Sequence, residues 1–309
     1  MRLATIDLGS NTVRFLAVET QAGPTWRVID QDQTVTRLAE GLTHRGVLGE
    51  GPMARTQRAV EAYVERSRRA RVESVRIVAT SAVRQATNGA DFAMAIGRAT
   101  GYAVDIVSGQ EEARLTLRGI AAGLGLPTGT VVAFDIGGGS TEYILAVDGV
   151  LRVAVSLSLG VVPLVEQWPG AGPLEEGQFQ TICAGIRDRL EAELPAAIRL
   201  ARPVTLIGTA GTATTLAALD LGLIRYDASR VQGHVLGRGA LDASLARLAR
   251  LTLEERGALP CLEPGRADLI IPGTAIVMAT LDCLGLEAMQ VSDWGIREGI
   301  IADMLEGAS

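Results

Sequence analysis

The chain has 309 residues, of which 48% are apolar and 4% aromatic, and 35 acidic against 29 basic residues give a formal net charge of −6. This size and apolar content suffice for two domains with cores of their own, and they exclude disordered, collagen-like and disulfide-stapled classes. Every basic residue other than His is Arg, which excludes mechanisms that need a Schiff-base Lys or a P-loop Lys. Three cysteines without C-x-x-C spacing indicate neither a disulfide framework nor a zinc site.

The first predicted elements are two strands, at residues 3–6 and 13–18, joined by a tight turn over residues 7–12. The same arrangement returns as a strand at 131–134, a turn at 135–141 and a strand at 143–147. Aligned without a gap, Asp7 matches Asp135, Gly9 matches Gly137, and Thr12 matches Ser140. We therefore interpret the chain as a duplication.

Helices are predicted from the spacing of apolar residues at 52–71, 89–99, 110–122, 175–200, 239–250, 272–284 and 295–306. A third glycine turn, with Gly208 and Gly211, joins a strand at 204–207 to a further helix at 212–219. Strands that alternate with helices predict an α/β protein.

The helix at 52–71 is expected to have a basic face. Its residues Arg55, Arg58, Arg66 and Arg69 fall within an arc of about 80°. A solvent-exposed surface helix is the ordinary explanation of this basic face. The alternative is a functional surface that guides a polyanion.

Two segments bear on localisation. The apolar run at the N-terminus is too short for a signal peptide before Asp7 interrupts it. Residues 206–224 contain several Thr and Gly residues and Asp220, so we read them as buried core and not as a membrane span. We expect a cytoplasmic protein that binds no membrane, and the sparse aromatics argue against nucleic-acid binding.

The two glycine turns are candidate phosphate sites, because glycine-rich turns present backbone N–H groups without side-chain obstruction. An ordinary hairpin explains either turn alone, but two matching turns can hold one phosphate from both sides. The candidate residues are Gly9, Ser10, Asn11 and Thr12 in the first turn, and Gly137, Gly138, Gly139, Ser140 and Thr141 in the second.

Carboxylates stand beside both turns. Asp7 and Asp135 end otherwise apolar strands, and Glu142 follows the second turn. A buried carboxylate is costly without a cation or donors, and Mg²⁺ suits a site with few carboxylates, several waters and phosphate ligands. Each acid could instead cap its turn, but the set of three favours Mg²⁺ or another divalent cation.

A group that activates water is the remaining requirement for hydrolysis of a phosphoanhydride. Glu111 and Glu112 are consecutive acids at a predicted helix start. Taken alone, such a pair is explained by its favourable interaction with the helix dipole.

Together these segments resemble the Ppx/GppA family, the exopolyphosphatases and guanosine pentaphosphate phosphatases of the actin and sugar-kinase ATPase superfamily. The segments that carry the resemblance are residues 6–12, 79–84 with Asn88, 108–113, 135–142, 208–212, 233–234, 266–268 with 272–273, and 292–299. The order of Asp-Ile-Gly-Gly-Gly-Ser-Thr-Glu at 135–142 after Ser-Gly-Gln-Glu-Glu-Ala at 108–113 is its most specific part.

The resemblance implies two duplicated ribonuclease-H-like domains with an interdomain cleft. Residues 1–118 would form the first domain and residues 119–294 the second, with a C-terminal helix at 295–309 that packs on the first. It also implies Glu112 as the catalytic base and Asp7, Asp135 and Glu142 as the metal-binding acids. Further phosphate-binding positions under this resemblance are Arg14, Arg84, Asn88, Gly208, Gly211 and Arg266.

The implied activity is an exopolyphosphatase that removes the terminal phosphate of polyphosphate with a divalent metal. We expect short chains as substrates, because longer family members carry a further helical C-terminal region. Guanosine pentaphosphate 5′-phosphohydrolase is the nearest alternative. A sugar- or acetate-kinase-like phosphotransferase and a non-catalytic nucleotide sensor are the others, and formation of a homodimer is left open.

Overall fold

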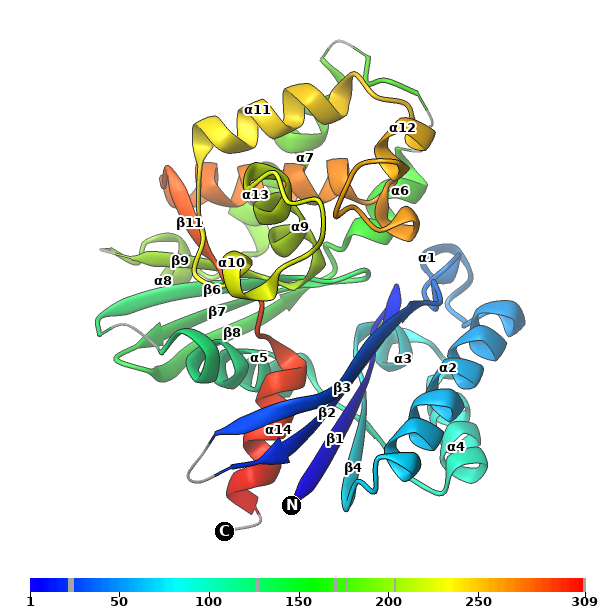
Figure 1. Cartoon of the computed structure of the whole chain (residues 1–309). Helices are drawn as coiled ribbons and strands as arrows, with labels where there is room; N and C mark the ends of the chain where they lie inside the picture. The colour runs from blue at the N-terminus through cyan, green and yellow to red at the C-terminus, as the bar shows by residue number, and fades with distance from the viewer. Residues whose placement is uncertain (22–24, 126–127, 169–171, 176, 203, 308–309) are drawn as a thin grey trace. The chain divides into compact units, whose positions relative to one another are not determined.

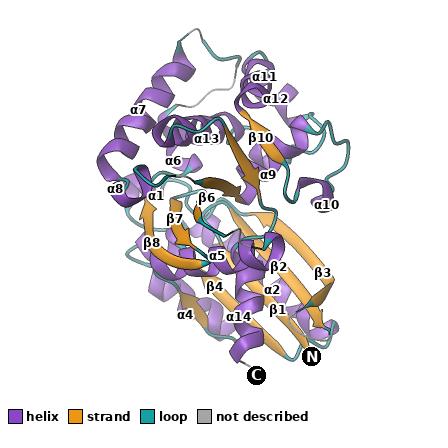
Figure 2. Cartoon of the chain, turned by 90° about the vertical axis from the view of Figure 1, so that its left-hand side faces the viewer, coloured by secondary structure: helices purple, strands orange, loops and turns teal. Residues whose placement is uncertain are grey.

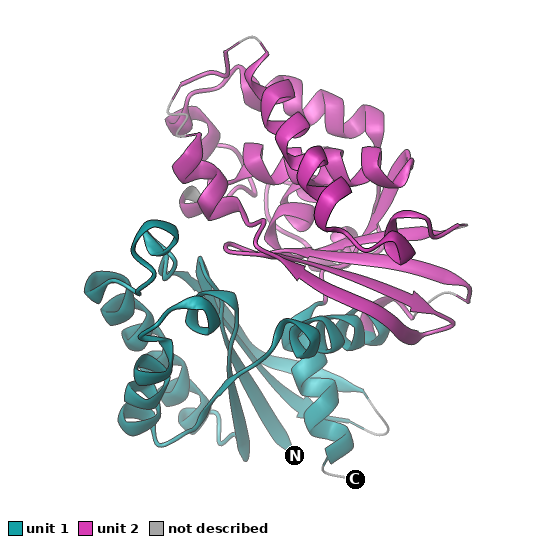
Figure 3. Cartoon of the chain, turned by 180° about the vertical axis from the view of Figure 1, so that it is seen from behind, with its two compact units in different colours: residues 1–122, 295–309 teal, residues 123–294 magenta. Residues whose placement is uncertain are grey.

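The structure is a computed structural model, and it describes residues 1–21, 25–125, 128–168, 172–175, 177–202 and 204–307. The chain divides into two compact units (Figure 3). Unit 1 consists of residues 1–122 and 295–309, and unit 2 of residues 123–294. The first boundary, predicted after residue 118, lies after Ala122 in the structure.

Unit 1 is built on a sheet whose strand order, in the described part of the chain, is β3-β2-β1-β4-β5 (Figure 1). β1 pairs antiparallel with β2 and parallel with β4, while β2 pairs antiparallel with β3 and β4 parallel with β5. The strands are β1 (Arg2–Leu8), β2 (Thr12–Thr20), β3 (Trp26–Val35), β4 (Ser74–Ala79) and β5 (Val104–Ile106).

Helices cover both faces of this sheet. On one face, Tyr63 of α2 stacks on Phe15 of β2 with ring centroids 5.1 Å apart. On the other face, Ile301 of α14 is buried against Leu3 and Leu16. The helices of unit 1 are α1 (Leu42–Arg45), α2 (Glu50–Arg69), α3 (Ser81–Gln85), α4 (Gly89–Thr100), α5 (Gly109–Leu124) and α14 (Ile296–Gly307).

α5 and α14 cross in backbone contact within unit 1. A Cβ atom on Gly119 would collide with the carbonyl of Gly295, and one on Gly299 would collide with the carbonyl of Leu115. Glycine is therefore required at both positions for this close approach. The crossing attaches the C-terminal helix to the helix that begins with the Glu111 and Glu112 pair.

Unit 2 is built on a sheet whose described strands have the order β10-β11-β9-β6-β7-β8. β6, β9 and β11 are parallel neighbours, and β7, β8 and β10 run antiparallel to theirs. The strands are β6 (Thr130–Ile136), β7 (Thr141–Val147), β8 (Val150–Leu157), β9 (Thr205–Thr209), β10 (Val235–Gly237) and β11 (Ala288–Val291).

The core of unit 2 lies between this sheet and its helices (Figure 2). α13 is buried along most of its length, and Tyr143 of β7 shares a hydrogen bond with Thr280 of α13 at 2.7 Å. The helices of unit 2 are α6 (Val161–Gln167), α7 (Gln178–Glu193), α8 (Ala196–Arg199), α9 (Ala210–Asp220), α10 (Ala228–Val231), α11 (Arg238–Ala249), α12 (Leu253–Gly257), a 3₁₀ turn (Pro264–Arg266) and α13 (Ile270–Leu284).

The single helix predicted at 175–200 is wrong. α7 ends at Glu193 and α8 begins at Ala196. Pro195 lies between them; it has no backbone N–H and pushes Leu194 out of the helical region, so the chain cannot continue as one helix.

Residues 206–224 form most of β9, all of α9 and the turn after it, and most of the α9 side chains are buried. Within the described residues, no helix has both the length and the apolar character needed to span a membrane.

Candidate functional site

The two glycine turns adopt matching conformations in the two units. In unit 1, the backbone N–H of Gly9 donates to the carbonyl of Thr12 at 3.1 Å; in unit 2, Gly137 donates to Ser140 at 2.9 Å. Each turn leaves the carboxyl end of an interior strand of its sheet, β1 or β6, and returns in an antiparallel neighbour. The local structure therefore repeats as the sequence alignment predicts.

Both turns also lie at the switch point of their sheets. After β1 the chain builds β2 and β3 on one side and then β4 on the other, and after β6 it builds β7 and β8 before β9. Ligands of open α/β sheets bind outside the carboxyl ends of strands at such points. The register places Asp7 beside Val78 of β4, and Asp135 beside Thr209 of β9.

Each turn presents backbone N–H groups that no described residue accepts from. Within the described residues, the N–H groups of Ser10 and Asn11 in unit 1 have no acceptor, and neither do those of Gly138 and Gly139 in unit 2. Buried or half-buried donors of this kind are costly unless a ligand or water accepts from them. Both turns are therefore suited to binding an anion.

The first turn is held in place by the segment that follows β3. The backbone N–H groups of Thr36 and Arg37 both donate to the carbonyl of Asn11 at 2.9 Å. The Asn11 side chain donates to the Thr12 hydroxyl at 3.3 Å, and its amide oxygen is buried without a hydrogen-bond partner in the described residues. The turn thus contains a buried acceptor available to a donor or cation.

Asp7 and Arg14 lie directly opposite each other in the β1–β2 ladder, so both side chains point to the same face of the sheet. This is the face of α5 and α14, because Val78, the β4 neighbour of Asp7, packs with Leu115 and Ile300. The carboxylate of Asp7 and the first turn of α5 therefore belong to one face of unit 1.

Glu112 is buried, with 8% of its surface exposed, in the first turn of α5. Arg84 of α3 donates to its carboxylate at 2.9 Å and to the carbonyl of Val107 at 2.8 Å. Both bonds come from one nitrogen, Nη1. The remaining N–H groups of Arg84 have no acceptor within the described part of the chain, so one guanidinium can hold Glu112 and still contact an anion.

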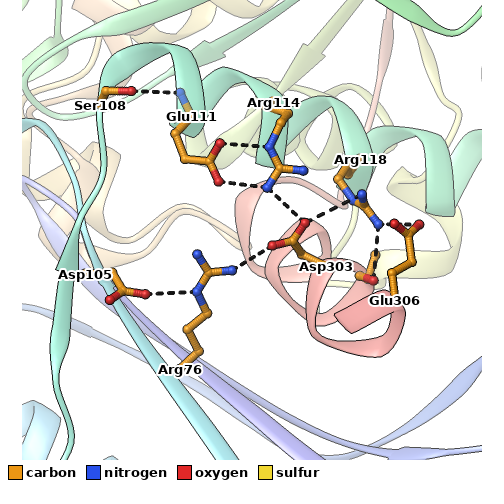
Figure 4. A network of polar contacts seen from close by, with 9 residues as sticks. Arg76, Asp105, Ser108, Glu111, Arg114, Arg118, Asp303 and Glu306 are labelled. Atoms are coloured by element: carbon orange, nitrogen blue, oxygen red, sulfur yellow. Dashed lines mark hydrogen bonds and ion pairs between the residues drawn. The ribbon is translucent and has the colours of Figure 1, made fainter. Parts of the chain in front are cut away.

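Glu111, the preceding residue, points elsewhere (Figure 4). Arg114 donates to both of its carboxylate oxygens, at 2.8 and 2.7 Å. These hydrogen bonds hold the pKa of Glu111 below its ordinary value, against the effect of partial burial. The structure therefore separates the two consecutive acids: Glu111 belongs to an ion-pair network, and Glu112 lies beside Arg84.

Asn88 has a structural role in this structure. Its side-chain nitrogen donates to the carbonyl of Leu48 at 3.0 Å, and its oxygen accepts from the N–H of Leu48 at 2.8 Å. Both ends of the amide are thus used to fasten the loop before α2 to the start of α4. For this reason we do not retain Asn88 as a phosphate contact.

In unit 2, Asp135 and Glu142 lie directly opposite each other in the β6–β7 ladder, and both are buried. The hydroxyls of Ser140 and Ser156 donate to one oxygen of Glu142, at 2.8 and 2.7 Å. The equivalent pair in unit 1 is Asp7 and Arg14, an acid and a base. The unit 2 pair carries two negative charges on one face, which is the more costly arrangement without a cation.

The second turn is anchored by the start of α6. The N–H groups of Val161 and Val162 donate to the carbonyls of Gly137 at 3.2 Å and Gly138 at 2.8 Å. The Thr141 hydroxyl donates to the carbonyl of Leu159, which makes Thr141 a structural residue of the turn. The carbonyl side of the turn is therefore occupied, and its N–H side is available.

The third glycine turn opens α9. Thr209, the N-cap, is extended, and Ala210, the first residue of α9, adopts a left-handed conformation with φ 66°. A side chain on Gly211 would collide with the guanidinium of Arg266, which pairs with Glu263 at 2.9 Å. Arg266 and Gly211 are therefore neighbours at the N-terminal end of a helix, where anions bind favourably.

The sequence profile of the Ppx/GppA phosphatase family matches residues 17–308. The chain belongs to the Ppx/GppA phosphatase family. This confirms the resemblance drawn from the glycine turns and the glutamate pair.

Curated relatives of this Ppx/GppA chain are similar over nearly their whole length. Exopolyphosphatase 2 of Mycobacterium tuberculosis is 35% identical over 314 residues, which cover 97% of each chain. Exopolyphosphatase 1 of Mycobacterium leprae is 28% identical over 310 residues, covering 99% of this chain and 90% of the relative.

The crystal structure of the Aquifex aeolicus Ppx/GppA family member is 30% identical, has a TM-score of 0.84, and covers 100% of this chain and 99% of that one. An exopolyphosphatase from Cytophaga hutchinsonii, at 24% identity and a TM-score of 0.91, has the same fold. The predicted α/β fold with two domains of the actin-like type is confirmed.

The basic face predicted for the helix at 52–71 is largely neutralised in this Ppx/GppA protein. Arg66 of α2 pairs with Asp30 and Asp32 of β3, and Arg55 pairs with Glu40 at 2.8 Å. The local positive charge that suggested a surface for guiding polyanions is thus compensated by acids that lie far away in the sequence.

The candidate metal ligands are few in the described part of the chain. No group of three or more His, Cys, Asp or Glu side chains in the described residues is arranged to hold an ion by itself. The opposed pair Asp135 and Glu142 still fits a hard cation such as Mg²⁺, which binds through one or two carboxylates and completes its shell with water and phosphate oxygens.

Proposed function

We propose that this chain is an exopolyphosphatase that hydrolyses the terminal phosphoanhydride bond of inorganic polyphosphate and releases orthophosphate. Membership of the Ppx/GppA phosphatase family and the exopolyphosphatases among its relatives support the reaction class. The single observation that carries the proposal is the buried carboxylate of Glu112, held at 2.9 Å by Arg84.

Glu112 is the general base in this proposal. It accepts a proton from a water molecule, the water oxygen attacks the terminal phosphorus, and the bond from that phosphorus to the bridging oxygen breaks. The shortened chain leaves with the electrons of that bond, and orthophosphate is released. Arg84 holds the carboxylate in one orientation by a charge-assisted hydrogen bond, and a general base has to be positioned in this way toward the proton that it accepts.

Phosphate oxygens would be bound in unit 1 by the unused N–H groups of Ser10 and Asn11, and in unit 2 by those of Gly138 and Gly139. Gly9 with Thr12, and Gly137 with Ser140, close these two turns by their own hydrogen bonds and so hold the donors in place. Backbone donors placed before the reaction lose little energy to reorganisation when charge develops on the oxygens. Arg14, Arg84 and Arg266, with Gly208 and Gly211, would supply the remaining positive charge and dipoles in a chain without Lys.

Mg²⁺ or another divalent cation would be held in unit 2 by Asp135 and Glu142. Asp7 is the acid at the matching position of unit 1 and is the further candidate ligand. Such a cation neutralises the phosphate oxygens and orients them. The fit rests on the directly opposed, buried carboxylates of Asp135 and Glu142. Ser140 and Ser156 donate to one oxygen of Glu142, which orients that carboxylate as supporting residues do in metal sites.

The test is the release of orthophosphate from polyphosphates of defined length and from guanosine pentaphosphate, with and without Mg²⁺. We expect hydrolysis of polyphosphate by the wild type and a fall of about 10²- to 10⁴-fold in kcat for Glu112→Gln. Glu61→Gln, which removes an exposed carboxylate of α2, is the matched control and should match the wild type.

Three outcomes would contradict this function. Faster turnover of guanosine pentaphosphate than of any polyphosphate would favour the nucleotide phosphohydrolase. Phosphate transfer that requires an acceptor hydroxyl would identify a phosphotransferase. Binding without turnover of either substrate would identify a sensor.

A further inference from the structure

Asp303 of the C-terminal helix α14 lies at the centre of a polar network that joins α14, α5, β4 and β5 of unit 1 (Figure 4). One of its carboxylate oxygens accepts from Arg114 of α5 at 2.9 Å, and the other accepts from Arg76 of β4 at 2.8 Å. The partners lie 189 and 227 residues away in the sequence. No sequence motif indicates this arrangement.

The network reaches the first turn of α5 through Arg114. The same guanidinium that contacts Asp303 binds both oxygens of Glu111. On the other side, Arg76 donates to Asp105 of β5 at 3.1 Å. Asp303 is therefore connected to the residue that precedes Glu112 by a chain of two ion pairs.

We propose that Asp303 is a positioning residue for Glu112, acting through Arg114 and Glu111. The inference rests on the proposed role of Glu112 as the base. It assigns α14, at the far end of the sequence, a part in orienting the residue that activates water.

Helix geometry supplies the physical reason. Consecutive residues of an α-helix point in directions about 100° apart. When Asp303 and Arg114 hold Glu111 on the side of α14, the rotation of α5 about its axis is restricted, and the direction of Glu112 is restricted with it. Arg84 then meets Glu112 on a different side of the helix, so the first turn is held from two directions.

Asp303 is an ionised carboxylate at neutral pH. Burial raises the pKa of Asp303, but the hydrogen bonds from Arg114 and Arg76 outweigh this effect and leave the pKa below its ordinary value. The side chains of Asp303 and Arg76 are about one-quarter exposed, at 25% and 26%. Connected and half-buried charges of this kind hold geometry better than isolated surface pairs.

Attachment of α14 does not depend on this network. The helix is already fastened by its backbone contact with α5 at Gly119 and Gly299, and by the burial of Ile300 against Leu115 and Val78. Loss of one carboxylate should therefore leave the unit folded, while the direction of the first turn of α5 becomes less well defined.

The experiment compares Asp303→Asn with Glu306→Gln. Glu306 lies on the same helix and pairs with Arg118, which also lies 3.6 Å from Asp303. Within the described residues the carboxylate of Glu306 contacts neither Arg114 nor Glu111, and it is 73% exposed. We expect Asp303→Asn to lower kcat for polyphosphate by about 10- to 100-fold, the scale of a small misplacement of a catalytic group, with KM changed less than about 2-fold. Glu306→Gln should match the wild type.

A second comparison separates positioning from loss of folded protein. If Asp303 acts through Glu112, Asp303→Asn should have no further effect on kcat in a Glu112→Gln background. Asp303→Glu, which restores the charge, should recover part of the lost kcat. An equal loss of kcat in the wild-type and Glu112→Gln backgrounds would overturn the proposal. So would a loss of kcat in Asp303→Asn that is fully explained by a lower melting temperature.

Hydrogen exchange keeps this result separate from the proposed function. The backbone N–H groups of residues 111–113 should exchange faster in Asp303→Asn than in the wild type and in Glu306→Gln. If the wild type does not hydrolyse polyphosphate, the proposed function fails, and the exchange measurement still decides whether Asp303 holds the first turn. Unchanged exchange at residues 111–113 would overturn the positioning role.

Discussion

Arg84 donates a hydrogen bond to the carboxylate of Glu112 at 2.9 Å, although 28 residues separate the two in the sequence. Arg84 lies in a short helix after β4, and Glu112 lies in the first turn of the helix after β5. The parallel pairing of β4 with β5 brings these two helix starts to one edge of the sheet. A guanidinium and a carboxylate thus meet where ligands of α/β sheets bind.

The first prediction concerns this pair. Arg84→Met should lower kcat/KM for polyphosphate by about 100-fold or more, because it removes a charge-assisted hydrogen bond to the base and a cation near the substrate. Arg84→Lys should recover only part of the activity, since an ammonium cannot hold Glu112 and a phosphate with one planar group. Steady-state kinetics of both variants, beside Arg98→Met on α4, provide the measurement. Equal activity of Arg84→Met and wild type would contradict a role for Arg84.

The second prediction concerns Gly211 at the start of α9. In Gly211→Ala the new methyl group would occupy the place of the Arg266 guanidinium, which is the end of a flexible side chain and can move away. The fold should survive, and KM for polyphosphate should rise by about 10-fold as Arg266 is displaced. Gly185→Ala on α7, where the methyl group meets nothing within 4 Å, is the control. An unchanged KM in Gly211→Ala would remove Arg266 from the phosphate site.

The third prediction concerns the crossing of α5 and α14. Gly299→Ala would place a methyl group against the backbone of Leu115, which cannot move without shifting a helix. We expect a loss of about 1–3 kcal/mol in the free energy of unfolding, measured by urea denaturation. Gly307→Ala, on the same helix and with open space around it, should not lose stability. Equal urea midpoints for Gly299→Ala and Gly307→Ala would show that α5 and α14 can move apart without loss of stability.

The fourth prediction is a pH dependence of stability. The folded-state pKa values of Asp303 and Glu111 lie below their ordinary values because of hydrogen bonds from arginines. Their contribution to stability is therefore complete above the unfolded-state values of about 4 and is lost as the pH falls through the lowered folded-state values.

Denaturation curves for wild type and Asp303→Asn, collected between about pH 7 and pH 2, test this dependence. The free energy of unfolding should fall more steeply with acidification in the wild type than in the variant. Parallel curves would show that Asp303 is not stabilised as a carboxylate.

Strands could be predicted from the sequence where the chain is continuously apolar. β1, β2, β6 and β7 are mostly buried strands, and all four were predicted from their apolar runs. β3 was not predicted, because an edge strand exposes most of its side chains and residues 26–35 contain few apolar residues. β5, β10 and β11 have only three or four residues each, too few to show a period.

The candidate site was predictable only in part, because a local sequence pattern does not show contacts between distant residues. The glycine turns and the acids beside them are contiguous in the sequence, so their pattern can be recognised. The roles of Glu111 and Asn88 depend on partners elsewhere: Glu111 belongs to the network of Asp303, and Asn88 is fastened to Leu48. Arg66 likewise looks free in the sequence and is paired with Asp30 in the structure.

By itself, the sequence determined that one unit, a strand followed by a glycine turn and a second strand, occurs twice in this chain. Apolar runs and glycines set the backbone conformation within a few residues, so this unit can be recognised locally. Only the tertiary structure decided which acidic and basic side chains form ion pairs. The energy of an ion pair depends on the distance between the charges in space and not on their separation in the sequence. Asp303 pairs with Arg76, 227 residues away, because the sheet and the crossing of α5 with α14 bring the two side chains together.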